Sequence, residues 1–230
     1  IVATKVAKLP TAAGLSPDNI RTACDASLSR LGTDYIDLYY AHEDDPDVPI
    51  AETLGAFGEL IAAGKVRHIA ASNFTPQRLR ESLEVAAAEG LPSYVATQDL
   101  YNLVDRSAYE DGLAQVVADF GLGLFPYYSL ARGFLTGKYQ PGITVDSPRA
   151  KGVEQYLGPR GDAVLTALSE VAAAHGVRQA AVALAWLLAK PGVVAPLASA
   201  RTVDQLDDLL AVGGLELTAD EVATLDAASA

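Results

Sequence analysis

The sequence predicts an α/β fold in which parallel strands alternate with helices. Apolar runs typical of strands begin near residues 1, 34, 66, 94 and 122, a spacing of about 30 residues that matches one βα unit. A sixth run begins near residue 192. The runs lack strict alternation of apolar and polar residues, as expected of parallel strands buried on both faces. Such a chain forms either a (β/α)8 barrel or a doubly wound sheet, and six units are two fewer than a barrel needs.

Composition and charge indicate one acidic globular domain covering residues 1–230. The chain is 50% hydrophobic and 20% charged, with a formal net charge of −12. That charge disfavours nucleic acid and anionic membranes as partners, so a local basic site must hold any anionic ligand. We expect a small-molecule substrate and no metal site. The only cysteine, Cys24, excludes an internal disulfide and is expected to pack as a small apolar residue. No apolar run is long enough to cross a bilayer and no signal peptide is visible. We therefore expect a cytoplasmic protein.

Each expected strand is a short run of apolar or β-branched residues bounded by turn-forming residues. The clearest is 35–41, which stops abruptly at His42. The expected strands cover residues 1–6, 35–41, 65–71, 94–98, 122–127 and 192–195.

The expected helices are marked by capping residues at their ends. Ser16 before Pro17 and Thr75 before Pro76 are typical of helix N-termini, and the segment from Thr218 to Glu221 has the pattern of a capping box. The expected helices cover residues 16–32, 49–63, 75–90, 108–120, 162–175, 179–189 and 202–210, with a last one from 218 onward. Between them, residues 129–160 form a long irregular stretch, and a loop of that length in a compact domain is usually functional.

Polar side chains follow the expected strands at the point where each strand ends. Because parallel strands end at one edge of the sheet, these groups should converge. Each residue taken alone also has a structural interpretation, such as a surface lysine, a turn-forming Ser-Asn pair or a helix cap. The groups are Lys5, His42, Ser72 with Asn73, Gln98, residues 128–132, and Ser199 with Arg201.

The chain resembles the aldo-keto reductases over essentially all of its length. The resemblance depends on an ordered series of motifs, and it is closest to the branch that includes bacterial reductases and potassium-channel β subunits. The motifs lie at residues 3–5, 27–38 with His42, 64–74, 98–103, 128–139 and 200–206.

The resemblance implies reduction of an aldehyde or ketone by hydride transfer from NADPH. Lys5 matches the lysine that lowers the pKa of a tyrosine acid, because a nearby ammonium favours the phenolate. His42 matches the histidine that orients the substrate carbonyl. Ser72, Asn73 and Gln98 match the residues that hold the nicotinamide carboxamide. Tyr128 matches the aromatic ring that stacks on the nicotinamide; the residues that match the pyrophosphate segment are Ser129, Leu130, Arg132, Gly133, Leu135 and Lys138.

The resemblance also implies an adenosine end. Arg201 matches the arginine over the 2′-phosphate, which favours NADPH over NADH because a guanidinium pairs well with a phosphate dianion. Ser199 and Gln205 match further adenosine contacts. The family often has Asn at the position of Asp208, and a carboxylate there accepts the exocyclic amine of adenine but repels phosphate.

A second departure lies at the start of the chain. In the family, a strand with the catalytic aspartate and a helix with the tyrosine acid precede the segment that matches residues 3–5. None of the ten tyrosines here matches that acid. We therefore expect an aldo-keto reductase (β/α)8 TIM barrel represented from about its third strand onward, which accounts for six units in place of eight.

Two other functions stay open at this point. The chain could be an NADPH-binding regulatory subunit with weak catalysis, or another (β/α)8 enzyme that uses His42 and Lys5 on a sugar phosphate. Substrate preference in this fold belongs to the loops. The candidate loops are residues 43–47, 103–106 and 144–157.

Overall fold

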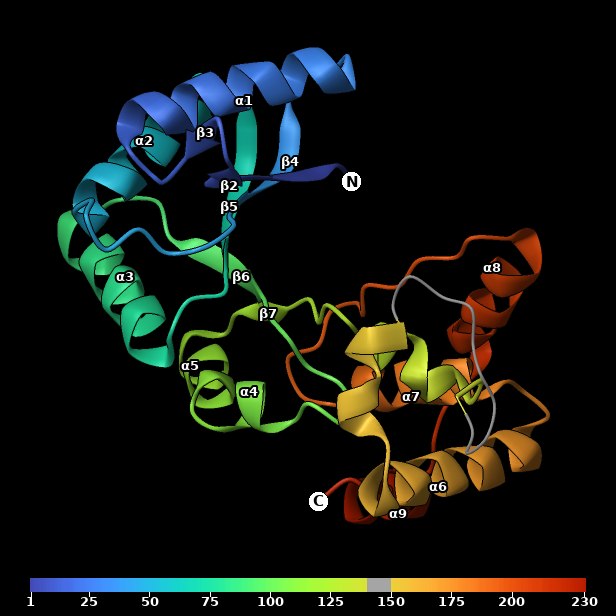
Figure 1. Ribbon diagram of the computed structural model, residues 1–230. Helices are drawn as coiled ribbons and strands as arrows, with labels where there is room; N and C mark the ends of the chain where they lie inside the picture. The colour runs from blue at the N-terminus through green and yellow to red at the C-terminus, as the bar shows by residue number, and fades with distance from the viewer. Residues whose placement is uncertain (140–149) are drawn as a thin grey trace. The chain divides into compact units, whose positions relative to one another are not determined.

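The computed structural model describes residues 1–139 and 150–230, which form two compact units (Figure 1). Unit 1 comprises Ile1–Asp99 and Gly112–Leu124, and unit 2 comprises Leu100–Asp111 and Phe125–Ala230. Unit 1 contains the parallel sheet, and unit 2 is mainly helical. The expectation of a single domain stays a prediction.

Unit 1 is built on a five-stranded sheet in the order β1-β4-β5-β6-β7, in which every neighbouring pair is parallel. This confirms the predicted α/β class. Lys5 lies opposite Tyr40, and Ser72 lies opposite Gln98, so these strands end at a common edge. The strands are β1 Ala3–Val6, β4 Ile36–Ala41, β5 Val66–Ser72, β6 Tyr94–Gln98 and β7 Gly123–Leu124.

The helices of unit 1 begin where the capping residues predicted. The Ser16 hydroxyl accepts a hydrogen bond from the Asn19 amide, and the Thr75 hydroxyl accepts one from the Arg78 amide. Cys24 is fully buried in α1, and burial raises the pKa of its thiol to about 11, as suits a packing residue. The helices are α1 Pro17–Leu31, α2 Ile50–Ala62, α3 Pro76–Glu89 and α5 Leu113–Phe120.

An antiparallel hairpin between β1 and α1 was not predicted. It pairs β2 Lys8–Leu9 with β3 Ala12–Ala13. Strands of two residues carry too little periodicity to be read from sequence. Hydrogen bonds hold β3 instead, because Asn19 Nδ2 donates to the Ala12 carbonyl at 3.0 Å and to the Ala13 carbonyl at 3.2 Å.

Unit 2 packs its helices around Trp186, which is fully buried 5.4 Å from the Tyr101 ring. Thr202 caps α8, and Thr218 with Glu221 forms the predicted capping box at the start of α9. The helices are α4 Ser107–Glu110, α6 Pro159–His175, α7 Gln179–Leu188, α8 Val203–Leu210 and α9 Ala219–Ala228. Short 3₁₀ turns are η1 Ala131–Thr136, η2 Ala150–Gly152, η3 Glu154–Tyr156 and η4 Ala211–Gly214.

The single helix predicted over residues 108–120 is wrong. The chain forms α4 and α5 with a break at Gly112, whose φ of 109° no helix accommodates. A glycine inside an apolar periodic pattern is often tolerated in a helix, so the pattern alone did not reveal the break.

The last two predicted strands are also corrected. The strand expected at 122–127 is reduced to β7 because Pro126 has no N–H to donate, and Tyr127 forms only an isolated bridge with Leu100. The strand expected at 192–195 does not form among the described residues. Prolines at 191 and 196 flank it, and only Val193 takes a bridge position.

Candidate active site

The C-terminal edge of the sheet in unit 1 gathers the first group of predicted site residues. Lys5 lies in β1 and His42 directly follows β4. Ser72 ends β5, Asn73 follows it, and Gln98 ends β6. The four neighbouring strands β1, β4, β5 and β6 therefore bring all five predicted residues of this unit to one edge. Their assigned roles stay predictions.

The environment of Lys5 and His42 shifts both toward their neutral forms. Partial burial lowers the pKa of Lys5, whose ammonium lies 5.3 Å from the centre of the Tyr40 ring. Burial, and then the positive charges of Lys5 and Lys8, lower the pKa of His42, against the opposing effect of Glu43. The imidazole is therefore neutral at pH 7, where it can donate one hydrogen bond to a carbonyl oxygen.

Hydrogen bonds join the ends of β4, β5 and β6. Asn73 Nδ2 donates to the His42 carbonyl and to Ser72 Oγ, each at 2.9 Å. Ser72 Oγ in turn donates to the Gln98 carbonyl at 2.7 Å. Asn73 has a φ of 58°, in the left-handed region that non-glycine residues rarely occupy. The edge is thus a connected polar network with a strained residue at its centre, as is common at functional sites.

Two residues of this edge were not identified from the sequence. Asp99 is buried and accepts a hydrogen bond from the Asn73 backbone amide at 2.9 Å. Burial raises the pKa of the Tyr40 phenol to about 12, although its hydrogen bond with the Gln98 side chain lowers it. Tyr40 therefore stays protonated and holds Gln98. A tyrosine within an apolar strand gives no sequence signal for such a role.

In unit 2, Tyr128 presents an aromatic ring at the surface. Its side chain is 41% exposed, and the Arg132 guanidinium lies 4.2 Å from the centre of its ring. Tyr128 has a φ of 52°. The fully buried Asn102 donates to the Tyr128 carbonyl at 3.0 Å and to Asp105 Oδ2 at 2.9 Å. Asn102 therefore fixes the backbone that carries the exposed ring, a function that the motif around it did not reveal.

The segment after Tyr128 is a tight turn. Ser129 Oγ donates to the Pro126 carbonyl at 2.9 Å, and the Leu130 carbonyl accepts from the Gly133 amide at 2.8 Å. Ala131, Arg132 and Gly133 have φ values of 47°, 58° and 97°, and Leu135 is buried beneath them. Lys138 packs closely, since a Cβ added to Gly133 would lie 3.3 Å from Lys138 Nζ. The structure thus brings the predicted pyrophosphate residues into one turn.

The predicted adenosine residues lie at and before α8. Ser199, Arg201 and Gln205 are exposed, and the Gln205 side chain accepts a hydrogen bond from the Arg201 amide at 2.9 Å. Among the described residues no carboxylate forms an ion pair with Arg201. Asp208 by contrast pairs with Arg178 at 3.6 Å, which reduces the repulsion that its carboxylate would exert on a phosphate.

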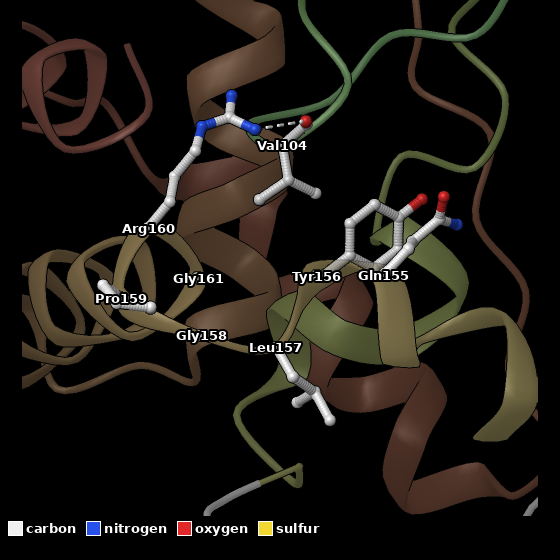
Figure 2. Close-up of a pocket in the computed structure, with 8 residues that line it drawn as sticks. All are labelled: Val104, Gln155, Tyr156, Leu157, Gly158, Pro159, Arg160 and Gly161. Atoms are coloured by element: carbon white, nitrogen blue, oxygen red, sulfur yellow. Dashed lines mark hydrogen bonds between the residues drawn. The ribbon is translucent and has the colours of Figure 1, made fainter.

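A small hollow of about 150 Å³ lies where two of the predicted specificity loops meet in unit 2 (Figure 2). It is lined by Val104 and by residues 155–161. Arg160 Nη1 donates to the Val104 carbonyl at 3.1 Å, and the Tyr156 hydroxyl donates to Asp105 Oδ2 at 2.7 Å. The loop 103–106 therefore contacts the described part of the loop 144–157. Residues 144–149 lie outside the described residues. None of the predicted catalytic or cofactor residues lines the hollow.

Within the described part of the chain, no group of three or more His, Cys, Asp or Glu side chains is arranged to bind a metal ion. No single described helix is long and apolar enough to span a bilayer; α6 and α7 meet the length and composition criteria only together, with a bend of 96° between them.

Comparison with known proteins identifies the relatives of this chain. The family model described as "Aldo/keto reductase family" matches residues 1–230. An aldo-keto reductase of Fusarium vanettenii is 35% identical over 90% of this chain and 56% of its own length. Protein tas of Escherichia coli is 35% identical over 93% of this chain and 69% of its own length. A putative voltage-gated potassium channel subunit beta of Schizosaccharomyces pombe is 32% identical over 90% of this chain and 63% of its own length. The chain therefore spans between 56% and 69% of the length of these relatives.

Proposed function

Because the chain belongs to the aldo/keto reductase family, we propose that it reduces an aldehyde or ketone to an alcohol with a hydride from NADPH. The observation that supports this most is the single sheet edge of unit 1, where Lys5 and His42 lie beside the network of Ser72, Asn73 and Gln98. We also propose that the strands of this sheet belong to a (β/α)8 barrel. A cytoplasmic location stays a prediction.

Each unit, taken by itself, has residues whose properties suit one part of NADPH. In unit 1, amide and hydroxyl groups at the sheet edge match the polar carboxamide of a nicotinamide. In unit 2, the exposed flat ring of Tyr128 can stack on an aromatic ring, and the exposed guanidinium of Arg201 suits a phosphate. When bound, NADPH supplies the hydride.

Lys5 and His42 have separate parts in the proposed reaction. His42, neutral at pH 7 because burial and two lysines lower its pKa, donates a hydrogen bond that orients the carbonyl oxygen. The partly buried ammonium of Lys5 favours the negative charge that develops on that oxygen and on the group that protonates it. The half-buried environment strengthens both effects, since solvent screening is weaker there.

The test follows oxidation of NADPH by its near-ultraviolet absorbance with a panel of aldehydes and ketones. Replacing Lys5 by Met should abolish turnover, and His42→Ala should lower kcat/KM at least about tenfold, because each removes stabilisation of the developing charge. Lys65→Met is the matched control. Lys65 directly precedes β5 at the opposite edge of the sheet and pairs with Asp25, so its loss should leave turnover unchanged.

A second candidate function is an NADPH-binding subunit that regulates a partner. It is favoured by the similarity to a protein named as a putative potassium channel subunit beta. Both functions require cofactor binding, but only the reductase turns over. Tight NADPH binding without turnover on any carbonyl would favour the regulatory subunit, and absence of binding would contradict both.

A further inference from the structure

Asp99 is a buried carboxylate for which the described residues provide no ion-pair partner. Its side chain is only 6% exposed. Oδ1 accepts a hydrogen bond from the Asn73 amide at 2.9 Å, and Oδ2 accepts a short one from the Thr97 hydroxyl. Burying a charged group without a cation is unfavourable. A carboxylate kept in such a place, at the sheet edge with the predicted site residues, indicates a function that offsets this cost.

The hydrogen bond from Asn73 connects Asp99 to a residue of the edge whose backbone is in the left-handed region. A non-glycine residue at a φ of 58° lies about 1 kcal/mol or more above its preferred conformations. Such a conformation persists only when the surroundings fix it. The side chain of Asn73 is held by the His42 carbonyl and Ser72 Oγ, and Asp99 holds its backbone.

The position of Asp99 in the chain adds a second constraint. It directly follows Gln98, whose carbonyl accepts the hydrogen bond from Ser72 Oγ at 2.7 Å. The segment 98–99 therefore contacts both members of the Ser72-Asn73 pair, through one backbone carbonyl and one side-chain carboxylate. Loss of the carboxylate leaves the Asn73 amide without this acceptor.

We propose that Asp99 is a positioning residue for the nicotinamide end of the cofactor. By accepting the Asn73 backbone N–H, it holds the Asn73 side chain and Ser72 in the orientation that binds the carboxamide. This inference rests on the proposed function, because it assigns the carboxamide to this edge. Burial raises the pKa of Asp99 to about 6, which is consistent with a carboxylate retained there at a cost.

The test compares three variants for NADPH affinity, by fluorescence titration, and for hydrogen exchange of the Asn73 amide without cofactor. Asp99→Ala should weaken NADPH binding roughly tenfold or more and speed Asn73 exchange, because the acceptor is lost. Asp99→Asn should restore both to within about threefold, because its amide oxygen can accept the same hydrogen bond. If Asp99→Ala does not fold, as judged by circular dichroism, Asp99→Ser is used in its place. The serine side chain is one bond shorter than that of aspartate, so its hydroxyl does not reach the Asn73 amide.

The matched control is Asp37→Ala. Asp37 also accepts a backbone hydrogen bond, from the Val2 amide at 2.8 Å, but near the start of β4 at the opposite sheet edge. It should leave NADPH affinity unchanged. The positioning function would be overturned if Asp99→Ala bound NADPH with wild-type affinity or left the exchange of the Asn73 amide unchanged. It would also be overturned if Asp37→Ala lost as much NADPH affinity as Asp99→Ala. Absence of NADPH binding by the wild-type protein would instead overturn the proposed function, and this inference with it.

Discussion

At the scale of single residues, burial determines the charge state of the groups at the sheet edge. Lys5, His42 and Asp99 all have pKa values shifted toward the neutral form, and burial is the largest cause in each case. Such shifts are typical of catalytic sites. The edge therefore combines a partly buried cation, a neutral imidazole and a carboxylate that titrates near neutral pH.

Asp99 should make the free energy of unfolding depend on pH in a defined direction. Its pKa is raised from 3.8 to about 6 in the folded protein, so the folded state binds its proton more tightly than the unfolded state. The contribution of Asp99 to stability is therefore lost as pH rises from about 4 to about 6. At about 1.4 kcal/mol for each pKa unit, the loss is on the order of 3 kcal/mol.

Replacing Asp99 by Asn removes this titration. The free energy of unfolding of Asp99→Asn, relative to that of the wild-type protein, should therefore increase as the pH rises from 5 to 7.5. Urea unfolding at the two pH values measures this difference. Asp37→Asn serves as control: the backbone hydrogen bond from Val2 lowers the pKa of Asp37, so its loss should not produce a relative gain at the higher pH. A difference between Asp99→Asn and wild type that is independent of pH would contradict this assignment.

At the scale of helices and strands, the sequence correctly predicted the elements whose ends are set by nearby capping residues. Side chains of Ser16, Thr75, Thr202 and Thr218 cap helices where their patterns indicated. The errors occur where tertiary structure decides. The φ of Gly112 breaks a helix that periodicity favours, and a strand at 192–195 needs a hydrogen-bonded neighbour that its own sequence does not specify.

The same distinction applies to the candidate site. Strand ends predicted that Lys5, His42, Ser72 and Gln98 would share an edge, because parallel topology determines it. The supporting residues could not be predicted. Asn102 and Asp99 act through hydrogen bonds to residues about 26 positions away along the chain, and no local pattern encodes a contact at that separation.

Helix α9 offers a test of one polar contact, between Asp226 and the buried indole of Trp186. Asp226 Oδ1 accepts a hydrogen bond from Trp186 Nε1 at 2.9 Å and pairs with Lys190 at 2.7 Å. Because Trp186 is fully buried, Asp226→Ala leaves its N–H unpaired. We expect the free energy of unfolding to fall by about 1–3 kcal/mol. Asp226→Asn should lose less, because it keeps an acceptor for the indole.

Urea unfolding followed by far-ultraviolet circular dichroism measures this effect. Fluorescence of Trp186, the only tryptophan in the chain, reports on unit 2 in the same experiment. Asp220→Ala on the exposed first turn of α9 is the control and should cost less than about 1 kcal/mol, the usual value of a charge near a helix N-terminus. Equal losses at the two positions would show that the buried contact contributes nothing specific.

At the scale of the whole molecule, the net charge of −12 opposes the proposed cofactor. NADPH carries several phosphate charges, so the field of the protein repels it and local cations must supply the attraction. Arg201 is exposed, and no described carboxylate forms an ion pair with it. The nearby carboxylate of Asp208 is already paired with Arg178. The predicted adenosine site in unit 2 therefore has a positive charge that no described carboxylate pairs with, in an acidic protein.

Arg201→Ala should consequently weaken NADPH binding by roughly ten- to a hundredfold, since hydrogen bonds to charged groups contribute about 1.5–3 kcal/mol. NADH lacks the 2′-phosphate, so its affinity should change less than about twofold. Arg67→Ala is the matched control: it removes one positive charge from the opposite edge of the sheet in unit 1, where Arg67 pairs with Asp37. Fluorescence titration with both cofactors measures the two affinities. If Arg201→Ala weakened the binding of NADPH and NADH equally, Arg201 would not bind the 2′-phosphate. If Arg67→Ala weakened NADPH binding as much as Arg201→Ala does, the net charge of the protein would determine the affinity, and not a local site.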